Sequence, residues 1–565
     1  MPAIKRYLWF IPLLLALAFG LRRSLSSPPS DFAGYYYGGK ALLQGQYPGA
    51  YDMTTLNDRI AADGYKDVFV SYAPFPPFSS LVVAPFLPLP MHLAKIVFNC
   101  FSIAVFLISL FRLTRYLSTP PGFILALPVI FFIPLLNNLA FGQSYLLLFA
   151  LLTEGWLAQD KGRPILSSAL WATAILFKLF PAFLFLFLLL RRKYRPAVYL
   201  GIACAALLIF SFLVNGFDAW EFYATHIVSK LNRGELNDSF TYIFQSAFML
   251  LKRAFVSDSL LNPYPITDNP WLFTTGMALF KAGLVSTAVL LTLRDKDDFF
   301  SFATWIAAAM LISPNGSSYS LILLLLPLLA LIRHSTASSE SQALQTPAPS
   351  SRLTASPNSP SPHSTAASPT SLIIAAVLLA AACTVSVTRL ASLPLLAQFP
   401  RLYLLLLFYI ALLLQQRRCW NAGLFTACAI LFFALDIRGN LPAKDPGTYV
   451  LTKEEHLFIC DYTALDSRLV YYWRDSEGRH QQATDYPIHS MTTANVTLKD
   501  NQVWYGGRQL TSSPDRKIKP SLVNGEYIIY LSDKDRGVDF FTLRKIRMDG
   551  SDGPPNAVAA PGSSR

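Results

Sequence analysis

The stretch ALWATAILFKLFPAFLFLFLLLRRKYR at residues 169–195 decides the fold class of this chain. Two apolar runs meet near Lys178 and Pro181, and a group of basic residues follows the second run. Backbone N–H and C=O groups in lipid must bond within their own segment, so these runs are expected to be helices. A proline at the junction disfavours one continuous helix. The pattern predicts a membrane hairpin whose basic end, 191–195, faces the cytoplasm.

Apolar runs of this kind recur along most of the 565 residues. Hydrophobic residues make up 53% of the chain and charged residues only 14%, whereas a soluble domain has about 25% charged residues. This composition excludes an ordinary soluble enzyme and predicts a polytopic α-helical membrane protein with about 13 spans. The approximate spans are 7–21, 93–111, 122–136, 143–158, 164–178, 180–190, 196–214, 271–293, 299–313, 318–333, 371–388, 402–416 and 420–436.

Basic residues at alternate connections predict the orientation of these spans. With a cytoplasmic N-terminus, the short outer connections are nearly free of Lys and Arg, and residues 22–91 and 215–270 form long outer loops. The first run lacks a convincing cleavage site and is followed by Arg22 and Arg23, so it is interpreted as a retained span. A multi-pass protein of the plasma (inner) membrane is expected. The basic residues of the predicted inner loops are Lys5, Arg6, Arg112, Arg115, Lys161, Arg163, the run 191–195, Arg294, Lys296, Arg333, Arg417 and Arg418.

The net charge of +13 does not indicate a nucleic-acid partner. Residues 438–565 hold 17 Lys and Arg against 16 Asp and Glu, so the excess lies in the membrane part. Basic residues beside apolar runs are what the positive-inside bias produces. The expected surroundings are a lipid bilayer.

Composition divides the chain into four parts. Residues 1–333 form the multi-span core, and 334–370, rich in Ser, Pro, Thr and Ala, are expected to be a disordered cytoplasmic linker. Residues 371–436 hold three further spans. Residues 437–565 alternate in polarity, as in EYIIYLS (526–532) and FFTLRKI (540–546), and predict a small β-rich extracytoplasmic accessory domain.

No metal or cofactor site is predicted. The six cysteines are scattered without metal-ligand spacing, and no G-x-x-x-x-G-K-[ST] loop occurs. Asp31 with Asp52 or Asp58 could bind a divalent ion, but no tight D-x-D is present.

The outer loop begins with SPPSDFAGYYYGGKALLQGQYPGAYD at 27–52, which places Asp31 at the membrane surface. An enzyme that moves a sugar from a lipid phosphate needs a base that deprotonates the acceptor hydroxyl where lipid meets water, and one Asp suffices. Its leaving group is already an activated phosphate. Alternatively, Asp31 or Ser30 caps the helix that starts here. The residues leave both readings open.

These residues resemble a known family. DFAGYYYGGKALLQGQYPGAYD (31–52) is similar to the first outer loop of the polyprenyl-phosphate-mannose-dependent mannosyltransferases, membrane enzymes of the GT-C class in glycosyltransferase family 87. The resemblance implies a GT-C fold, mannose as the sugar and Asp31 as general base. Four further stretches follow in the family's order: SYAPFPPFSSLVVAPFLPLP (71–90), NNLAFGQSYLLLFALL (137–152), the hairpin at 169–195, and LISPNGSSYSLILLLLPLLAL (311–331).

Further site residues have two readings each. An intramembrane lysine is costly, so Lys178 is a candidate for binding the carrier phosphate unless it snorkels to the surface. Gln143 and Asn138 could bond sugar hydroxyls or cap helix ends, and Tyr72 could line the sugar pocket or be an interfacial aromatic like Tyr35–Tyr37. Arg22 or Arg23 could help to stabilise the departing phosphate.

The Ser-Pro turn departs from the family pattern. Relatives continue into Trp and His, whereas this chain continues into Asn315 and Gly316. His226 is a possible substitute, and Asn237, Asp238 and Ser239 could supply polar contacts, although Asn-Asp-Ser is also a common turn.

The leading prediction is an inverting hexosyltransferase that takes its sugar from a polyprenyl-phosphate donor and transfers it to a glycan or glycolipid acceptor. The alternatives are a flippase or transporter of lipid-linked sugars and a receptor for a wall polymer. Transporters often show internal repeats and ionisable residues deep in their spans. Here the polar residues gather at the outer loop ends and no repeat is found.

Overall fold

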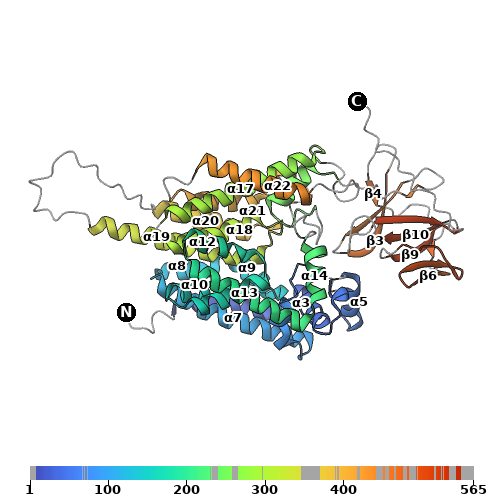
Figure 1. The fold of residues 1–565 in the computed structure, drawn as a ribbon, viewed down its shortest axis with the longest axis horizontal. Helices are drawn as coiled ribbons and strands as arrows, with labels where there is room; N and C mark the ends of the chain where they lie inside the picture. The colour runs from blue at the N-terminus through green and yellow to red at the C-terminus, as the bar shows by residue number, and fades with distance from the viewer. Residues whose placement is uncertain are drawn as a thin grey trace, which may run out of the picture.

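Helices make up the described chain up to residue 440, and short strands the part after it (Figure 1). The structure is a computed structural model. It describes residues 8–440 except 52, 66–67, 69, 71, 73, 229–230, 232–239, 258–261, 263–264, 296, 345–368, 388–389, 391–392 and 416–419, together with segments of 450–548.

Each predicted span coincides with a helix or with two consecutive helices. Short helices fill the outer loops between them. The helices of the first half are α2 (Ile11–Ser26), α3 (Ser30–Leu43), α4 (Tyr47–Tyr51), α5 (Met53–Ala62), α6 (Ser79–Val83), η1 (Ala84–Phe86), α7 (Met91–Tyr116), α8 (Pro121–Ile130), α9 (Phe132–Phe141), α10 (Tyr145–Asp160), α11 (Pro164–Phe177), η2 (Phe180–Ala182), α12 (Phe183–Leu190) and α13 (Tyr194–Asn215). Those of the second half are α14 (Phe217–Phe222), η3 (Tyr223–Ile227), α16 (Ala247–Phe255), α17 (Pro270–Arg294), α18 (Asp298–Ile312), η4 (Ser318–Leu324), α19 (Leu325–Leu344), α20 (Pro369–Thr384), η6 (Leu395–Gln398), α21 (Pro400–Leu413) and α22 (Ala422–Asn440).

The structure confirms long apolar helices, but it does not confirm the predicted count of 13 spans. Among the described residues, four helices are long and apolar enough to cross a membrane, or five if α8 and α9, bent by 55°, count as one span. The other apolar helices are shorter, because breaks such as the one at Lys178–Pro181 interrupt the runs. Thirteen crossings and the GT-C fold stay predictions. The four long helices are Met91–Tyr116, Tyr194–Asn215, Pro270–Arg294 and Ser318–Ser335.

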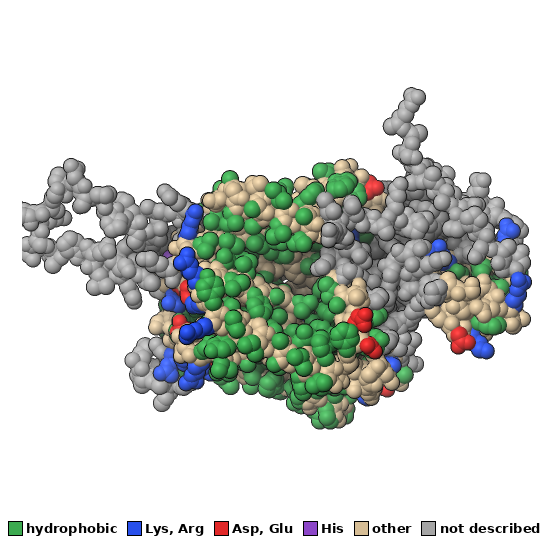
Figure 2. Space-filling view, in the orientation of Figure 1, with side chains coloured by type: hydrophobic (Ala, Val, Ile, Leu, Met, Phe, Trp, Pro, Cys, Tyr) green, Lys and Arg blue, Asp and Glu red, His purple; other side chains and the backbone are tan. Residues whose placement is uncertain are grey.

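The predicted inner connections meet at one end of the helical body, where Lys and Arg side chains gather (left in Figure 2). Arg191 donates to the backbone oxygen of Asp295 at 2.6 Å and pairs with Asp298 at 3.0 Å. Lys193 also pairs with Asp298, at 2.5 Å. Helices α3, α5 and α14 lie at the opposite end (Figure 1). This segregation agrees with the alternation expected from the sequence.

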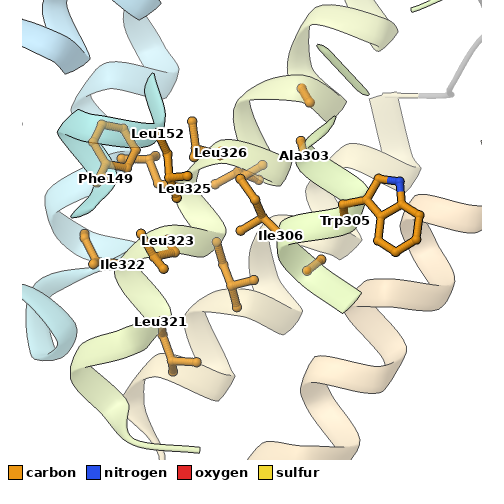
Figure 3. Packing of buried hydrophobic residues seen from close by; sticks show 14 of the residues in the cluster. Phe149, Leu152, Ala303, Trp305, Ile306, Leu321, Ile322, Leu323, Leu325 and Leu326 are labelled. Atoms are coloured by element: carbon orange, nitrogen blue, oxygen red, sulfur yellow. The ribbon is translucent and has the colours of Figure 1, made fainter. Parts of the chain in front are cut away.

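The core lies where α10, α18 and the η4–α19 segment meet. Leu326 lies between Leu152 of α10 and Ile306 of α18, and Leu323 and Leu321 belong to the same η4–α19 segment (Figure 3). All five side chains are buried. Burial of apolar surface from three helices stabilises their packing and holds the turn before η4 against the end of α9.

A second apolar cluster fills the first outer loop. Tyr35 of α3 stacks on Phe75 with ring centroids 4.2 Å apart, and Tyr51 and Tyr72 pack beside them. The Tyr51 hydroxyl donates to the backbone oxygen of Phe75 at 2.9 Å. This loop is therefore a packed unit with its own core, which holds α3 in a defined place.

A partly buried ion pair joins α22 to α17. Lys281 of α17 bonds both carboxylate oxygens of Asp436 in α22 at 2.8 Å. The predicted linker does not begin at residue 334, because α19 continues to Leu344; residues 345–368 lie outside the described residues.

Strands dominate the described part of 450–548, as the alternating pattern predicts. The expected strands at 526–532 and 540–546 correspond to β10 (Tyr527–Ser532) and β11 (Thr542–Arg547), which pair antiparallel. The sheet orders are β1-β2-β3-β4, β11-β10-β9-β5 and β6-β7-β8. The other strands are β1 (Val450–Leu451), β2 (Leu457–Thr463), β3 (Asp466–Arg474), β4 (His480–Gln482), β5 (Met491–Thr492), β6 (Val496–Lys499), β7 (Gln502–Tyr505), β8 (Arg508–Gln509) and β9 (Lys517–Val523).

Candidate active site

Asp31 lies in the first turn of α3, directly after the turn that leaves α2. The N-cap of α3 is Pro29, which makes no side-chain capping hydrogen bond. The structure therefore does not place Asp31 at the N-cap, and the side chain of Ser30 is not among those described. The helix dipole favours a carboxylate in the first turn.

Gln143 binds the carboxylate. Its Nε2 donates to Asp31 Oδ2 at 2.6 Å. Its own Oε1 accepts from the hydroxyl of Tyr35 at 3.5 Å, and that hydroxyl also lies 2.9 Å from Ser144 Oγ. The amide is thus oriented from both sides, which leaves Asp31 Oδ1 without a hydrogen-bond partner among the described residues.

Lys178 stands where α11 ends, and three aromatic rings surround its ammonium. The Nζ lies 4.4 Å from the ring centroid of Phe75, 4.8 Å from that of Tyr145 and 5.7 Å from that of Tyr35. Aromatic faces attract a cation. Within the part of the chain that the structure describes, the ammonium makes neither an ion pair nor a hydrogen bond. Lys178 therefore points into the cluster and does not snorkel away from it.

Three basic and polar groups oppose the cost of burying Asp31. Burial raises the pKa of the Asp31 carboxyl above its ordinary value. The hydrogen bond from Gln143 and the charges of Lys178 and Lys95 act in the other direction and lower that pKa. A carboxylate in this setting is a stronger base than one in water, while its neighbours favour the ionised form.

Two polar residues of α7 that support this site were missed in the sequence. Lys95 donates to the backbone oxygens of Pro28 at 2.9 Å and Ala140 at 2.6 Å. Asn99 donates to Ser24 Oγ and to the backbone oxygen of Leu139, both at 2.9 Å. The signal was present, since polar residues four apart on an apolar span share one helix face.

Several predicted site residues make hydrogen bonds within the protein. Asn138 is fully buried and its Nδ2 donates to the backbone oxygen of Tyr319 at 3.2 Å. Tyr72 is buried too, and its hydroxyl bonds Ser79 Oγ. The backbone N–H of Asn315 bonds Ser313 Oγ at 3.4 Å. The bond of Asn138 ties α9 to η4, and the other two bonds are local. The roles of these residues in sugar binding stay predictions.

Of the remaining candidates, the structure describes the side chains of Arg22 and Arg23 alone. Arg22 and Arg23 lie near the end of α2 and are exposed. His226 lies in the turn η3, and its side chain is not among those described. Asp52, with Asn237, Asp238 and Ser239, lies outside the described residues, as does the side chain of Asp58.

Gly142 is expected to be essential for the position of Gln143. It ends α9 in the left-handed region, with φ at 67°, and a Cβ added there would lie 2.6 Å from Phe32 Cβ, next to Asp31. Gly142→Ala strains the turn and displaces Phe32, so it should lower stability by about 1–3 kcal/mol and reduce activity. Thermal unfolding and turnover check this. Gly162→Ala is the matched control, because its φ of 68° carries the same strain with no atom near the added Cβ.

Comparison with known proteins supports the assignment of this region. Residues 73–314 match the family model of glycosyltransferase family 87. This part of the chain is thus similar to glycosyltransferase family 87, and the match confirms the resemblance predicted from the sequence. The match contains Gln143 and Lys178 and begins after Asp31, which is joined to it by the bond to Gln143. No curated protein matches the chain. The match indicates a glycosyltransferase, and the long apolar helices indicate a membrane protein.

Proposed function

We propose that this glycosyltransferase moves a hexose, mannose by its family resemblance, from a polyprenyl-phosphate carrier to an extracytoplasmic glycan or glycolipid. The observation that carries the proposal is one cluster, in which the Asp31 carboxylate, the Gln143 amide and the Lys178 ammonium come together. The cluster lies between α3, α10 and the end of α11, at the end of the body opposite the basic connections. A lipid-borne phosphate reaches this end from the bilayer.

The proposed reaction is a single displacement with inversion. Asp31 Oδ1 accepts the proton of the acceptor hydroxyl while Gln143 holds Oδ2. The acceptor oxygen forms a bond to the anomeric carbon as the bond from that carbon to the phosphate oxygen breaks. The electron pair leaves with the polyprenyl phosphate, and the proton stays on Asp31 until solvent removes it.

Lys178 suits the role of phosphate partner. Negative charge grows on the phosphate oxygen as the bond breaks, and a positioned cation stabilises that charge more in a water-poor site than in solution. The aromatic rings of Phe75 and Tyr145 hold the ammonium without neutralising it. A carboxylate partner would remove this capacity.

The test is sugar transfer by the purified full-length protein in nanodiscs. Radiolabelled polyprenyl-phosphate mannose and lipid or glycan extracts should give a labelled product, and labelled nucleotide sugars should give none. Transfer from a nucleotide sugar alone would contradict the proposed donor. Repeating the assay in detergent, where the two sides of the membrane are lost, separates transfer from flipping, because a flippase forms no new glycosidic bond under any condition.

A further inference from the structure

Lys95 is a fully buried lysine whose ammonium bonds only backbone carbonyls among the described residues. It sits in the second turn of α7 and has no exposed surface. Its acceptors are Pro28 O at 2.9 Å and Ala140 O at 2.6 Å. Burying an ammonium without an adjacent carboxylate is unfavourable, and such lysines are rare unless paired. A neutral donor could make the same carbonyl bonds, so the charge needs an explanation.

The two carbonyls belong to the two segments that carry the Asp31–Gln143 bond. Pro28 lies three residues before Asp31, and Ala140 lies three residues before Gln143. One ammonium therefore fastens both chain segments beside the carboxylate and its amide partner. Asn99, one helical turn further along α7, repeats the connection through Ser24 and Leu139.

The charge of Lys95 acts on Asp31 and the charge of Asp31 acts on Lys95. The other charged group that acts on Asp31 is Lys178, from the end of α11. The Asp31 charge also acts on three tyrosine hydroxyls, those of Tyr35 in α3, Tyr145 in α10 and Tyr319 in η4. Lys95 thus supplies positive charge to the carboxylate from α7, and Lys178 supplies it from the aromatic cluster at the end of α11.

We propose that Lys95 is a positioning residue for the glycosyl transfer. Its carbonyl bonds hold Asp31 and Gln143 in register, and its buried charge offsets the burial of the Asp31 carboxylate. The ammonium touches neither donor nor acceptor, because its hydrogen bonds are made to the protein backbone. The role of Lys95 in glycosyl transfer rests on the proposed function. The charge coupling between Lys95 and Asp31 does not depend on that function.

The first test is the pH profile of kcat/KM. Lys95→Met should shift the acidic limb upward by about 0.5–1 pH unit, because the lost positive charge no longer favours the ionised carboxylate. Asn99→Leu is the matched variant, since it removes contacts to the same two segments without removing a charge. It should lower activity and leave the limb in place. An unmoved limb in Lys95→Met would overturn the charge role.

The second test needs no activity. Thermal unfolding at pH 7.5 is measured for Lys95→Met in the wild-type and in the Asp31→Asn background. If the lysine offsets the carboxylate, the fall in Tm should be at least halved in the Asp31→Asn background. A variant that folds only in that background is the extreme form of this result. Equal losses of Tm, or failure to fold in both backgrounds, would overturn the proposal even if Asp31 proves not to be the base.

Discussion

Replacing Asp31 by Asn should abolish sugar transfer while the protein stays folded. Loss of a general base costs about 10²–10⁴-fold in rate. The amide is nearly isosteric, and its Oδ1 can still accept the hydrogen bond from Gln143 Nε2 that Asp31 Oδ2 accepts now, at 2.6 Å. The measurement is turnover with polyprenyl-phosphate mannose, beside thermal unfolding of the same preparation.

The raised pKa of Asp31 determines the direction in which Asp31→Asn should change Tm. Burial raises the pKa of Asp31 in the folded protein above its ordinary value. A raised carboxyl pKa contributes stability at pH values below the ordinary value, and this contribution is lost as the pH rises through the folded pKa. At neutral pH the ionised carboxylate therefore opposes folding. Asp31→Asn should leave Tm unchanged or raise it near neutral pH.

The same shift governs the wild-type pH profile. The base must be ionised, so kcat/KM should fall as the pH is lowered through the raised pKa of Asp31, and the limb should lie above the ordinary range of a carboxyl group. Asp63→Asn is the matched control. Asp63 is an exposed carboxylate of the same outer loop that accepts from the Tyr37 hydroxyl at 2.6 Å, and its loss should leave transfer intact. Full activity of Asp31→Asn would exclude Asp31 as the base.

The positions of the helices could be predicted because lipid imposes a simple pattern on the sequence. Each apolar run became a helix, and the breaks fall at glycine and proline positions such as Gly142 and Pro181. The number of these helices that cross a membrane could not be predicted from the hydropathy pattern. Short and bent helices such as the α8–α9 pair depend on packing against neighbours, which hydropathy does not record.

The site was predictable only in part. Lys178 stands out because an ionisable residue within an apolar hairpin is costly, and Asp31 because it follows the first span at the membrane surface. Both reach the same cluster. Asn138 was chosen for its place in an outer turn, and its buried side chain donates to the backbone oxygen of Tyr319. Lys95 was passed over because a lysine near the start of a span resembles an interfacial anchor. Only the folded chain shows that its ammonium is directed inward, onto Pro28 and Ala140.

Lys178→Met should lower turnover about 10²–10³-fold, the effect of removing one group that stabilises charge in the transition state. Met keeps much of the length of the side chain and suits the aromatic surroundings of Phe75 and Tyr145. The protein should therefore remain folded, and the loss should appear in kcat as well as in KM for the donor. Separate measurement of the two constants checks this.

Two further variants test whether the positive charge at position 178 is what matters. Lys178→Arg keeps the positive charge and can stack on the same rings, so it should retain more activity than Lys178→Met. Lys40→Met removes an exposed lysine of α3 near the same end of the molecule and should have no effect. If Lys178→Met alters only KM, the lysine binds the carrier equally in ground and transition states and does not assist its departure. If it alters neither constant, the ammonium among the aromatic rings is structural, and the phosphate must be met by another cation.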